Sequence, residues 1–143
     1  MIAVDTNILV YAHRRDSQLH DPAAVVMREL AQGRAAWAIP WPCLHEFLAV
    51  ATHPRIYDPP TPIEGALAQV DAWLESPSLV LLKESTDHWA VLSGLIAGAR
   101  TAGAQVHDAR IAAICQAGGV RELWSADRDF SRFPLKVRNP LFA

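Results

Sequence analysis

Hydrophobic and polar residues follow two alternating patterns along the chain. Short apolar runs, typical of the buried strands of parallel sheets, occur at residues 1–5, 36–40, 79–82, 122–126 and 135–138. Between them, apolar residues recur at the three-and-four spacing of helices, at residues 6–11, 21–32, 42–52, 61–75, 86–103 and 108–117. Alternating strands and helices predict an α/β fold with three layers, α/β/α, around a central, mainly parallel sheet of about four to five strands.

Local signals suggest where some helices begin and how they pack. Asp21 is the expected N-cap of the second helix, with Pro22 at its first helical position. Residues 61–64 (TPIE) have the spacing of a capping box at the start of another helix. Gly94 and Gly98 are expected to allow close packing of a later apolar helix.

The length and composition favour one folded domain that covers residues 1–143. Hydrophobic residues make up 51% of the chain and charged residues 20%, which excludes a disordered chain. Cys43 and Cys115 are too few for a disulfide framework and are expected to be buried, reduced thiols. The chain begins without a leader pattern, and no apolar run approaches the roughly 20 residues of a membrane span, so we expect a cytoplasmic protein.

Four acidic residues occupy positions from which they could share one crevice. Asp5 and Asp127 each follow a predicted strand, and ligands of parallel sheets bind beyond the carboxyl ends of the strands. Asp108 begins a helix in line with its apolar face, and Glu46 borders the apolar stripe of an earlier helix. Each acid alone also fits a turn, a helix cap or a solvated position, but together they indicate a common site.

Four close carboxylates would have to bind protons or cations. Two unit charges about 5 Å apart repel by roughly 3 kcal/mol at an effective dielectric constant near 20. Hard oxygen ligands without convergent Cys or His favour Mg²⁺ or Mn²⁺ over Zn²⁺, and neither His45 nor His107 has the spacing of a zinc motif. Such a site suits phosphodiester hydrolysis, in which the metal lowers the pKa of a bound water.

These motifs resemble those of the PIN-domain proteins, and among them the VapC-type toxins of bacterial toxin–antitoxin pairs. The resemblance rests on residues 4–9 (VDTNIL), on Glu46, on residues 108–113 (DARIAA) and on residues 125–130 (SADRDF). It spans nearly the whole chain, including residues 138–140 (RNP). Any one motif is weak, but four motifs in order on the expected elements are specific.

The resemblance implies a role for each residue of the site. The metal ligands and catalytic residues would be Asp5, Glu46, Asp108 and Asp127. Asn7 and Ser125 would orient ligands or water, and Asp129 would be a supporting acid or an additional ligand. Many relatives have Thr where this chain has Ser125, and the hydroxyl is kept. Arg110 and Arg128 adjoin the acids and are the expected contacts to RNA phosphates.

The function implied by the resemblance is that of a Mg²⁺- or Mn²⁺-dependent endoribonuclease, which cleaves structured RNA such as tRNA or ribosomal RNA. Its partners would be a cognate VapB-type antitoxin and a second copy of the chain in a homodimer. The antitoxin's C-terminal tail would lie in a groove bordered by residues 54–62 and the helix that follows.

Net charge does not discriminate between the functional alternatives. The chain carries −2, and setting aside the four acids leaves +2 for the remainder. One alternative is a phosphatase of the haloacid-dehalogenase kind, although most of those enzymes have a second acid two residues after the nucleophile, where this chain has Asn7. The other alternative is a module that binds RNA or an antitoxin without cleavage.

Overall fold

A five-stranded parallel sheet forms the centre of the molecule. The structure is a computed structural model and describes residues 1–142. Every strand pair is parallel, and the strand order is β3-β2-β1-β4-β5. The strands are β1 (Ile2–Val4), β2 (Trp37–Pro40), β3 (Leu79–Leu82), β4 (Glu122–Trp124) and β5 (Val137–Arg138). The predicted sheet is therefore confirmed, with its last strand at an edge.

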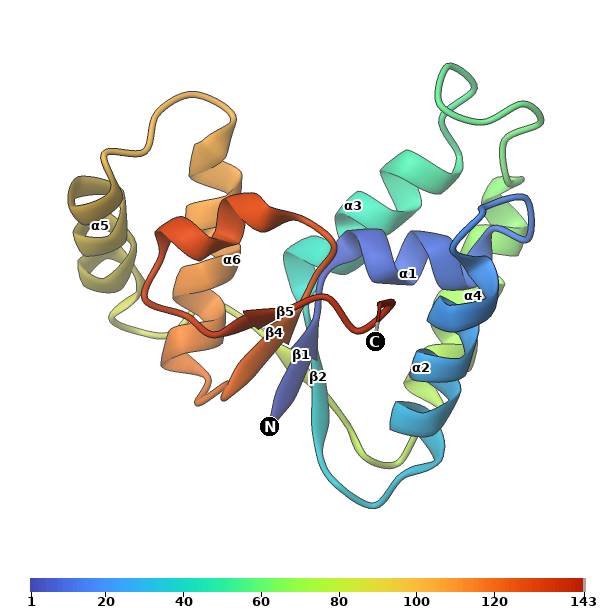
Figure 1. The fold of residues 1–143 in the computed structure, drawn as a ribbon, viewed down its shortest axis with the longest axis horizontal. Coiled ribbons are helices and arrows are strands. Elements are labelled where there is room, and N and C mark those ends of the chain that lie inside the picture. Colours follow the sequence, from blue (N-terminus) through green and yellow to red (C-terminus); the bar gives the residue numbers. More distant parts are fainter. Residues whose placement is uncertain (143) are drawn as a thin grey trace.

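Helices cover both faces of this sheet. They are α1 (Thr6–His13), α2 (His20–Gln32), α3 (Trp41–Ala51), α4 (Ile63–Leu74), α5 (His88–Ala99) and α6 (Gln105–Ala117), with a short 3₁₀ helix η1 (Arg128–Arg132). In Figure 1, α5 and α6 lie to the left of the strands, and α1, α2 and α4 lie to the right. The three-layer architecture expected from the sequence is confirmed. None of the described helices combines the length and hydropathy needed to cross a bilayer.

The strand order creates a crevice at one edge of the sheet. The chain runs from β1 to β2 and β3 on one side, and then returns to place β4 on the other side of β1. The connections leaving β1 and β4 therefore diverge, which is the topological switch point where parallel sheets bind ligands. Asp5 follows β1 directly, and Ser125 and Asp127 follow β4.

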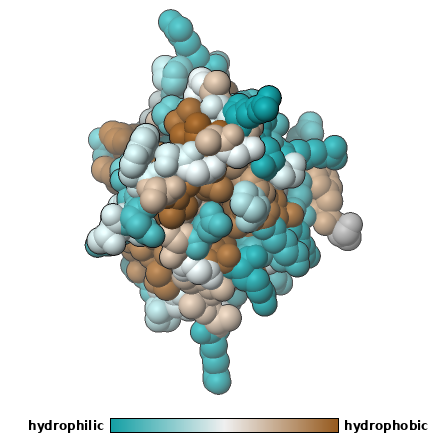
Figure 2. Space-filling view, turned by 90° about the vertical axis from the view of Figure 1, so that its left-hand side faces the viewer, coloured by the Kyte–Doolittle hydropathy of each residue, from teal (hydrophilic) through white to brown (hydrophobic). Residues whose placement is uncertain are grey.

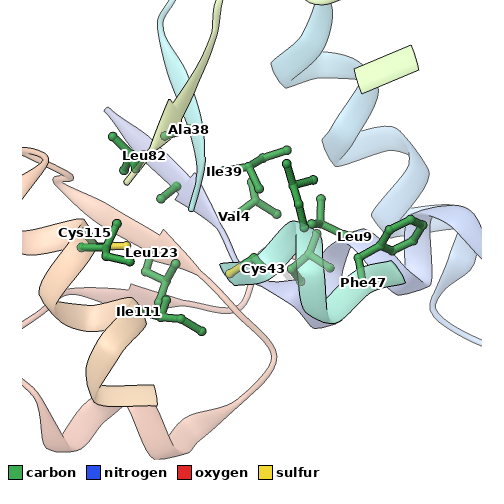
Figure 3. Close-up of a cluster of buried hydrophobic side chains, with 14 of the residues drawn as sticks. Val4, Leu9, Ala38, Ile39, Cys43, Phe47, Leu82, Ile111, Cys115 and Leu123 are labelled. Atoms are coloured by element: carbon green, nitrogen blue, oxygen red, sulfur yellow. The ribbon is translucent and has the colours of Figure 1, made fainter. Parts of the chain in front are cut away.

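The core occupies both faces of the sheet. Figure 3 shows Ile111, Cys115 and Leu123 in one group, and Ile39, Leu9 and Phe47 in another. Cys43 and Cys115 are buried and unlinked, as expected. Because the central strands β1 and β2 are covered on both sides, their side chains form continuous apolar runs, and this explains why the sequence pattern identified them.

The predicted start of α2 is wrong by one residue, and its predicted cap by two. The helix begins at His20 with Leu19 as N-cap, and no side chain caps it. The Leu19 carbonyl accepts a hydrogen bond from the backbone N–H of Ala23 at 3.1 Å, so the first turn already includes Asp21. Pro22 lies in this first turn, where its missing N–H costs nothing.

The predicted capping box of α4 does not form. Pro62 is the N-cap, and no side chain caps the helix. The Thr61 hydroxyl instead contacts Nε2 of His13 at 3.0 Å and accepts a hydrogen bond from Arg14 at 3.2 Å. A tertiary contact with α1 therefore replaces the local one.

Two expectations for the second half of the chain are also wrong. Gly94 and Gly98 have nothing within 4 Å of the position of a Cβ atom, so they do not serve close packing among the described residues. Helix α6 begins at Gln105, so Asp108 lies within its first turn and not at its start.

Candidate active site

A pocket of about 220 Å³ lies at the crevice and brings the four predicted acids together. Each acid comes from a different part of the chain: the end of β1, helix α3, helix α6 and the segment after β4. The acids that line the pocket are Asp5, Glu46, Asp108 and Asp127. The sequence prediction that they share one crevice agrees with this geometry.

Asp5 is held by hydrogen bonds on both carboxylate oxygens. As N-cap of α1, it accepts from the backbone N–H of Thr6 at 2.8 Å through Oδ1. The Ser125 hydroxyl donates to Oδ2 at 2.7 Å, and the Asn7 amide donates to the same oxygen at 3.3 Å. The Cys43 thiol lies 3.6 Å from Oδ1. The orientation of the carboxylate is therefore set by its surroundings.

Burial makes the negative charge of Asp5 unfavourable. The side chain is almost fully buried, and this raises its pKa from 3.8 to about 6. Hydrogen bonds from Ser125 and Thr6 oppose the shift, while the negative charge of Glu46 adds to it. A bound cation would reverse the balance by stabilising the ionised form.

Hydrogen bonds of Ser125 and Asn7 connect the two chain segments that carry Asp5 and Asp127. The Ser125 hydroxyl oxygen accepts from the backbone N–H of Asp127 at 2.9 Å and from the Asn7 amide at 3.2 Å. The side-chain carbonyl oxygen of Asn7 (Oδ1) accepts a hydrogen bond from the backbone N–H of Ala126 at 3.0 Å. These bonds fix the spacing between the carboxylates after β1 and β4.

Asp127 caps the short helix η1 and stands beside two other acids. Its Oδ1 accepts from the backbone N–H of Asp129 at 2.8 Å. One carboxylate oxygen each from Asp108, Asp127 and Asp129 lie within 4.8 Å of one another. Asp129 is exposed at the rim and also lies 3.8 Å from the Arg132 guanidinium. The three acids therefore form one group at the mouth of the site, in which Asp129 is exposed and Asp108 and Asp127 are partly buried.

Negative charges of neighbouring acids raise the pKa values of Glu46 and Asp108. The pKa of Glu46 is raised first by burial and then by the negative charge of Asp108. The pKa of Asp108 is raised by burial and then by the charges of Asp127 and Asp5. This mutual repulsion is the electrostatic signature of a site that attracts a cation.

The chemical character of the lining fits a hard metal ion. The buried Thr6 hydroxyl lines the pocket beside the Glu46 carboxylate, whose pKa it lowers, and makes no close hydrogen bond among residues 1–142, so it can also bond to a water. The Cys43 thiol is a poor ligand, because burial raises its pKa well above its ordinary value and keeps it protonated. Carboxylate and hydroxyl oxygens are the ligands that Mg²⁺ and Mn²⁺ prefer.

The two predicted RNA-contacting arginines do not line this pocket. Arg110 donates to Glu84 Oε1 at 2.8 Å and borders a neighbouring hollow that also includes His107. Arg128 borders a second hollow, on the other side of Asp127. Each of these hollows shares one acid with the pocket, Glu46 in the first and Asp127 in the second.

Several lining residues were missed by the sequence interpretation. Thr6 adjoins Asp5 and could have been recognised from that position, whereas nothing in the sequence singles out Cys43, which lies behind the pocket wall against Asp5. Tyr11 and Tyr57 also line the pocket, and Tyr57 comes from the Pro-rich loop between α3 and α4.

The chain belongs to the PIN-domain family, whose model matches residues 2–136. Its curated relatives include the ribonuclease VapC43 of Mycobacterium tuberculosis, which is 34% identical over 99% of this chain and 96% of that protein. The ribonuclease VapC48 of the same species is 28% identical over 95% of this chain and 94% of that protein.

Solved structures show the same fold. The VapBC2 structure from Rickettsia felis, bound to a promoter DNA fragment, matches with a TM-score of 0.70 at 22% identity, over 96% of this chain and 98% of that one. The crystal structure of FitAcB from Neisseria gonorrhoeae matches with a TM-score of 0.73 at 15% identity, over the full length of both chains. The fold predicted from the resemblance is thereby confirmed.

Proposed function

We propose that this protein is a metal-dependent endoribonuclease of the VapC type, the toxin of a toxin–antitoxin pair, with residues 1–143 forming its single nuclease domain. The observation that carries the proposal is the convergence of four carboxylates, from four separate elements, in one pocket at the switch point of the sheet. The names of the VapC relatives support the ribonuclease activity.

Asp5, Glu46, Asp108 and Asp127 would hold one or two Mg²⁺ or Mn²⁺ ions, with Asp129 as a supporting acid at the rim. The bound metal would supply a water of lowered pKa and neutralise the charge that develops on the leaving oxygen. Ser125 and Asn7 keep the Asp5 carboxylate in a single orientation through the bonds at 2.7 and 3.3 Å. The Thr6 hydroxyl, beside Glu46, would bond to a water in the same pocket.

Structured RNA, such as tRNA or ribosomal RNA, is the proposed substrate. A protein of the same fold, VapC20 of Mycobacterium tuberculosis, is a toxin that cleaves the sarcin–ricin loop. Arg110 and Arg128 flank the acidic pocket on two sides and would contact phosphates beyond the cleaved bond. Because Arg110 is already paired with Glu84, its contact would require that pair to open.

The proposed partners are a VapB-type antitoxin and a second copy of the chain. Related VapBC complexes support the antitoxin. For the homodimer, the supporting feature is helix α5, whose outer side carries Trp89 with 74% of its surface exposed. Figure 2 views the molecule from the side of α5 and α6 and shows apolar side chains gathered on this face. A cytoplasmic location stays a prediction.

The alternatives from the sequence have less support. The family match gives none to a haloacid-dehalogenase-like phosphatase. Asn7, which occupies the place of that family's second acid, is bonded to Asp5 and Ser125 and serves the geometry described above. A module that binds without cleavage would not need all four acids in one pocket.

The decisive experiment is a cleavage assay. Antitoxin-free protein is incubated with total cellular RNA in Mg²⁺, in Mn²⁺ and in EDTA, and fragment ends are mapped. Asp5→Asn, which conserves volume and removes the charge, serves as the matched control. We expect discrete cuts that require the metal and Asp5. Intact RNA in every lane, or equal cleavage by Asp5→Asn, would refute the proposed mechanism.

A further inference from the structure

The pocket extends past the acids onto aromatic and aliphatic side chains. Tyr11 lies one turn after Asn7 on α1, and Val50 lies one turn after Glu46 on α3, and all four line the same pocket. One helical turn advances about 5.4 Å, so the apolar part begins about that far beyond Asn7 on α1 and beyond Glu46 on α3. Tyr57 completes this part of the wall. The pocket therefore has an acidic end and an aromatic end.

The ring of Tyr57 is positioned by contacts to α1. The Arg14 guanidinium carbon lies 4.3 Å from the centre of the ring. Arg14 in turn donates to the carbonyl of Pro59 at 3.0 Å and pairs with Asp16 at 2.6 Å, and its side chain is 11% exposed. The backbone N–H of Tyr57 also donates to the carbonyl of His53 at 3.0 Å. The ring is thus held at the pocket wall while remaining half-exposed.

This arrangement presents an aromatic surface and not a free charge. The guanidinium of Arg14 is already engaged with Asp16, so the aromatic end cannot act mainly by binding phosphate. Unpaired nucleobases stack on tyrosine rings whatever their identity, because every base has a π-face. A phosphodiester held at the acidic end would bring its adjoining nucleotide within reach of the aromatic end.

We infer that Tyr57, positioned by Arg14, is a stacking site for an unpaired nucleobase next to the cleaved phosphodiester. The inference rests on the proposed ribonuclease function and narrows its substrate to RNA cut within a single-stranded loop or bulge. A base inside a paired stem would have to leave its stack before it could reach the ring. RNA is favoured over a protein segment because the aromatic wall is continuous with the proposed reaction centre.

The test measures RNA affinity in the Asp5→Asn background, in which cleavage is blocked. The probe is a 5′-fluorescein hairpin that spans the cut mapped in the cleavage assay, read by fluorescence anisotropy. Tyr57→Ala should weaken binding roughly 5- to 150-fold, the range of one lost stacking contact, and Tyr57→Phe should retain the affinity. Ile56→Ala is the matched control, since Ile56 is on the same loop, 52% exposed and not part of the pocket lining.

Hairpins with one abasic nucleotide near the cut identify the base concerned. If the missing base is the one that contacts Tyr57, the abasic hairpin should bind the Asp5→Asn protein more weakly than the intact hairpin does. The Asp5→Asn protein that also carries Tyr57→Ala should bind both hairpins equally. If the protein with Tyr57→Ala binds RNA as tightly as the Asp5→Asn protein from which it was made, the stacking site is refuted, but the proposed nuclease activity is not. If Tyr57→Ala instead weakens only the binding of the antitoxin tail, the aromatic end is a protein-binding site and the inference is wrong. If the wild-type protein cuts no RNA and the Asp5→Asn protein binds none, both the ribonuclease function and the stacking site are refuted.

Discussion

The hydroxyl of Ser125 donates a 2.7 Å hydrogen bond to Oδ2 of Asp5, although 120 positions separate the two residues in the chain. The bond joins the end of β1 to the segment after β4, and the same hydroxyl oxygen accepts from the backbone N–H of Asp127. One small side chain therefore sets the distance between two of the four acids.

Replacing Ser125 with Ala should impair cleavage without unfolding the protein. The variant loses a hydrogen bond to a charged group, and loss of such a supporting contact typically costs about 10- to 100-fold in metal affinity or activity. Cleavage rates measured over a range of Mg²⁺ concentrations should show a raised metal requirement. Ser125→Thr, which keeps the hydroxyl, should restore most of the activity; equal losses in both variants would show that the hydroxyl is not the cause.

The raised pKa of Asp5 predicts that the metal-free protein loses stability as pH rises from about 4 to 6. In that interval the folded state, with a pKa of about 6, binds more protons than the unfolded state, with a pKa of 3.8, so the free energy of unfolding falls with pH. A shift of this size corresponds to about 3 kcal/mol at most.

Thermal unfolding in EDTA at pH 5 and pH 7 measures this effect. Asp5→Asn should remove much of the pH dependence and be more stable than wild type at pH 7. Mg²⁺ should stabilise wild type at pH 7, by about 2.7 kcal/mol at 100 times its Kd, but not Asp5→Asn. A wild-type protein that gains stability from pH 5 to pH 7 in EDTA would contradict the account of Asp5.

Both cysteines should resist modification in the folded protein. Cys43 and Cys115 are fully buried, and burial raises the pKa of Cys115 to about 12, so almost no thiolate is present near neutral pH. Titration with a thiol-reactive disulfide reagent at pH 8 should detect no thiol before denaturation and both afterwards. Rapid reaction of Cys43 in the native protein would mean that the region around Asp5 opens readily.

Trp89→Asp should convert a homodimer to a monomer. A carboxylate in place of this exposed ring, in the first turn of α5, would be costly to bury against a second copy. The molar mass is measured by size-exclusion chromatography with light scattering. Val25→Asp on α2, where Val25 is 45% exposed, is the control that should leave the mass unchanged. A monomeric wild type, or a dimer that survives Trp89→Asp, would rule out this interface.

Much of the fold could be predicted because its elements carry local patterns. The central strands β1 and β2 are covered on both faces, so they read as apolar runs, and α3 shows helical spacing around Phe47. Errors arose where a tertiary contact overrode a local signal. Thr61 had the spacing of a cap, but His13 and Arg14 engage its hydroxyl.

The candidate acids were also predictable, since Asp5 and Asp127 follow strands whose ends meet at one edge of the sheet. Cys43 and Tyr57 were not predictable as parts of the site. Neither lies in a motif: Cys43 meets Asp5, and Tyr57 meets the pocket, only because α3 and the loop after it pack against α1.

Local patterns in the chain were enough to specify the elements, the parallel sheet and the identity of the four acids, because these depend on periodicity and on the residues next to each strand end. How those acids are held, and what completes their pocket, emerged with the packing of the layers. The bond from Ser125 to Asp5, the raised pKa of Asp5 and the placement of the Tyr57 ring all depend on burial and on contacts between distant segments. No local pattern encodes such contacts.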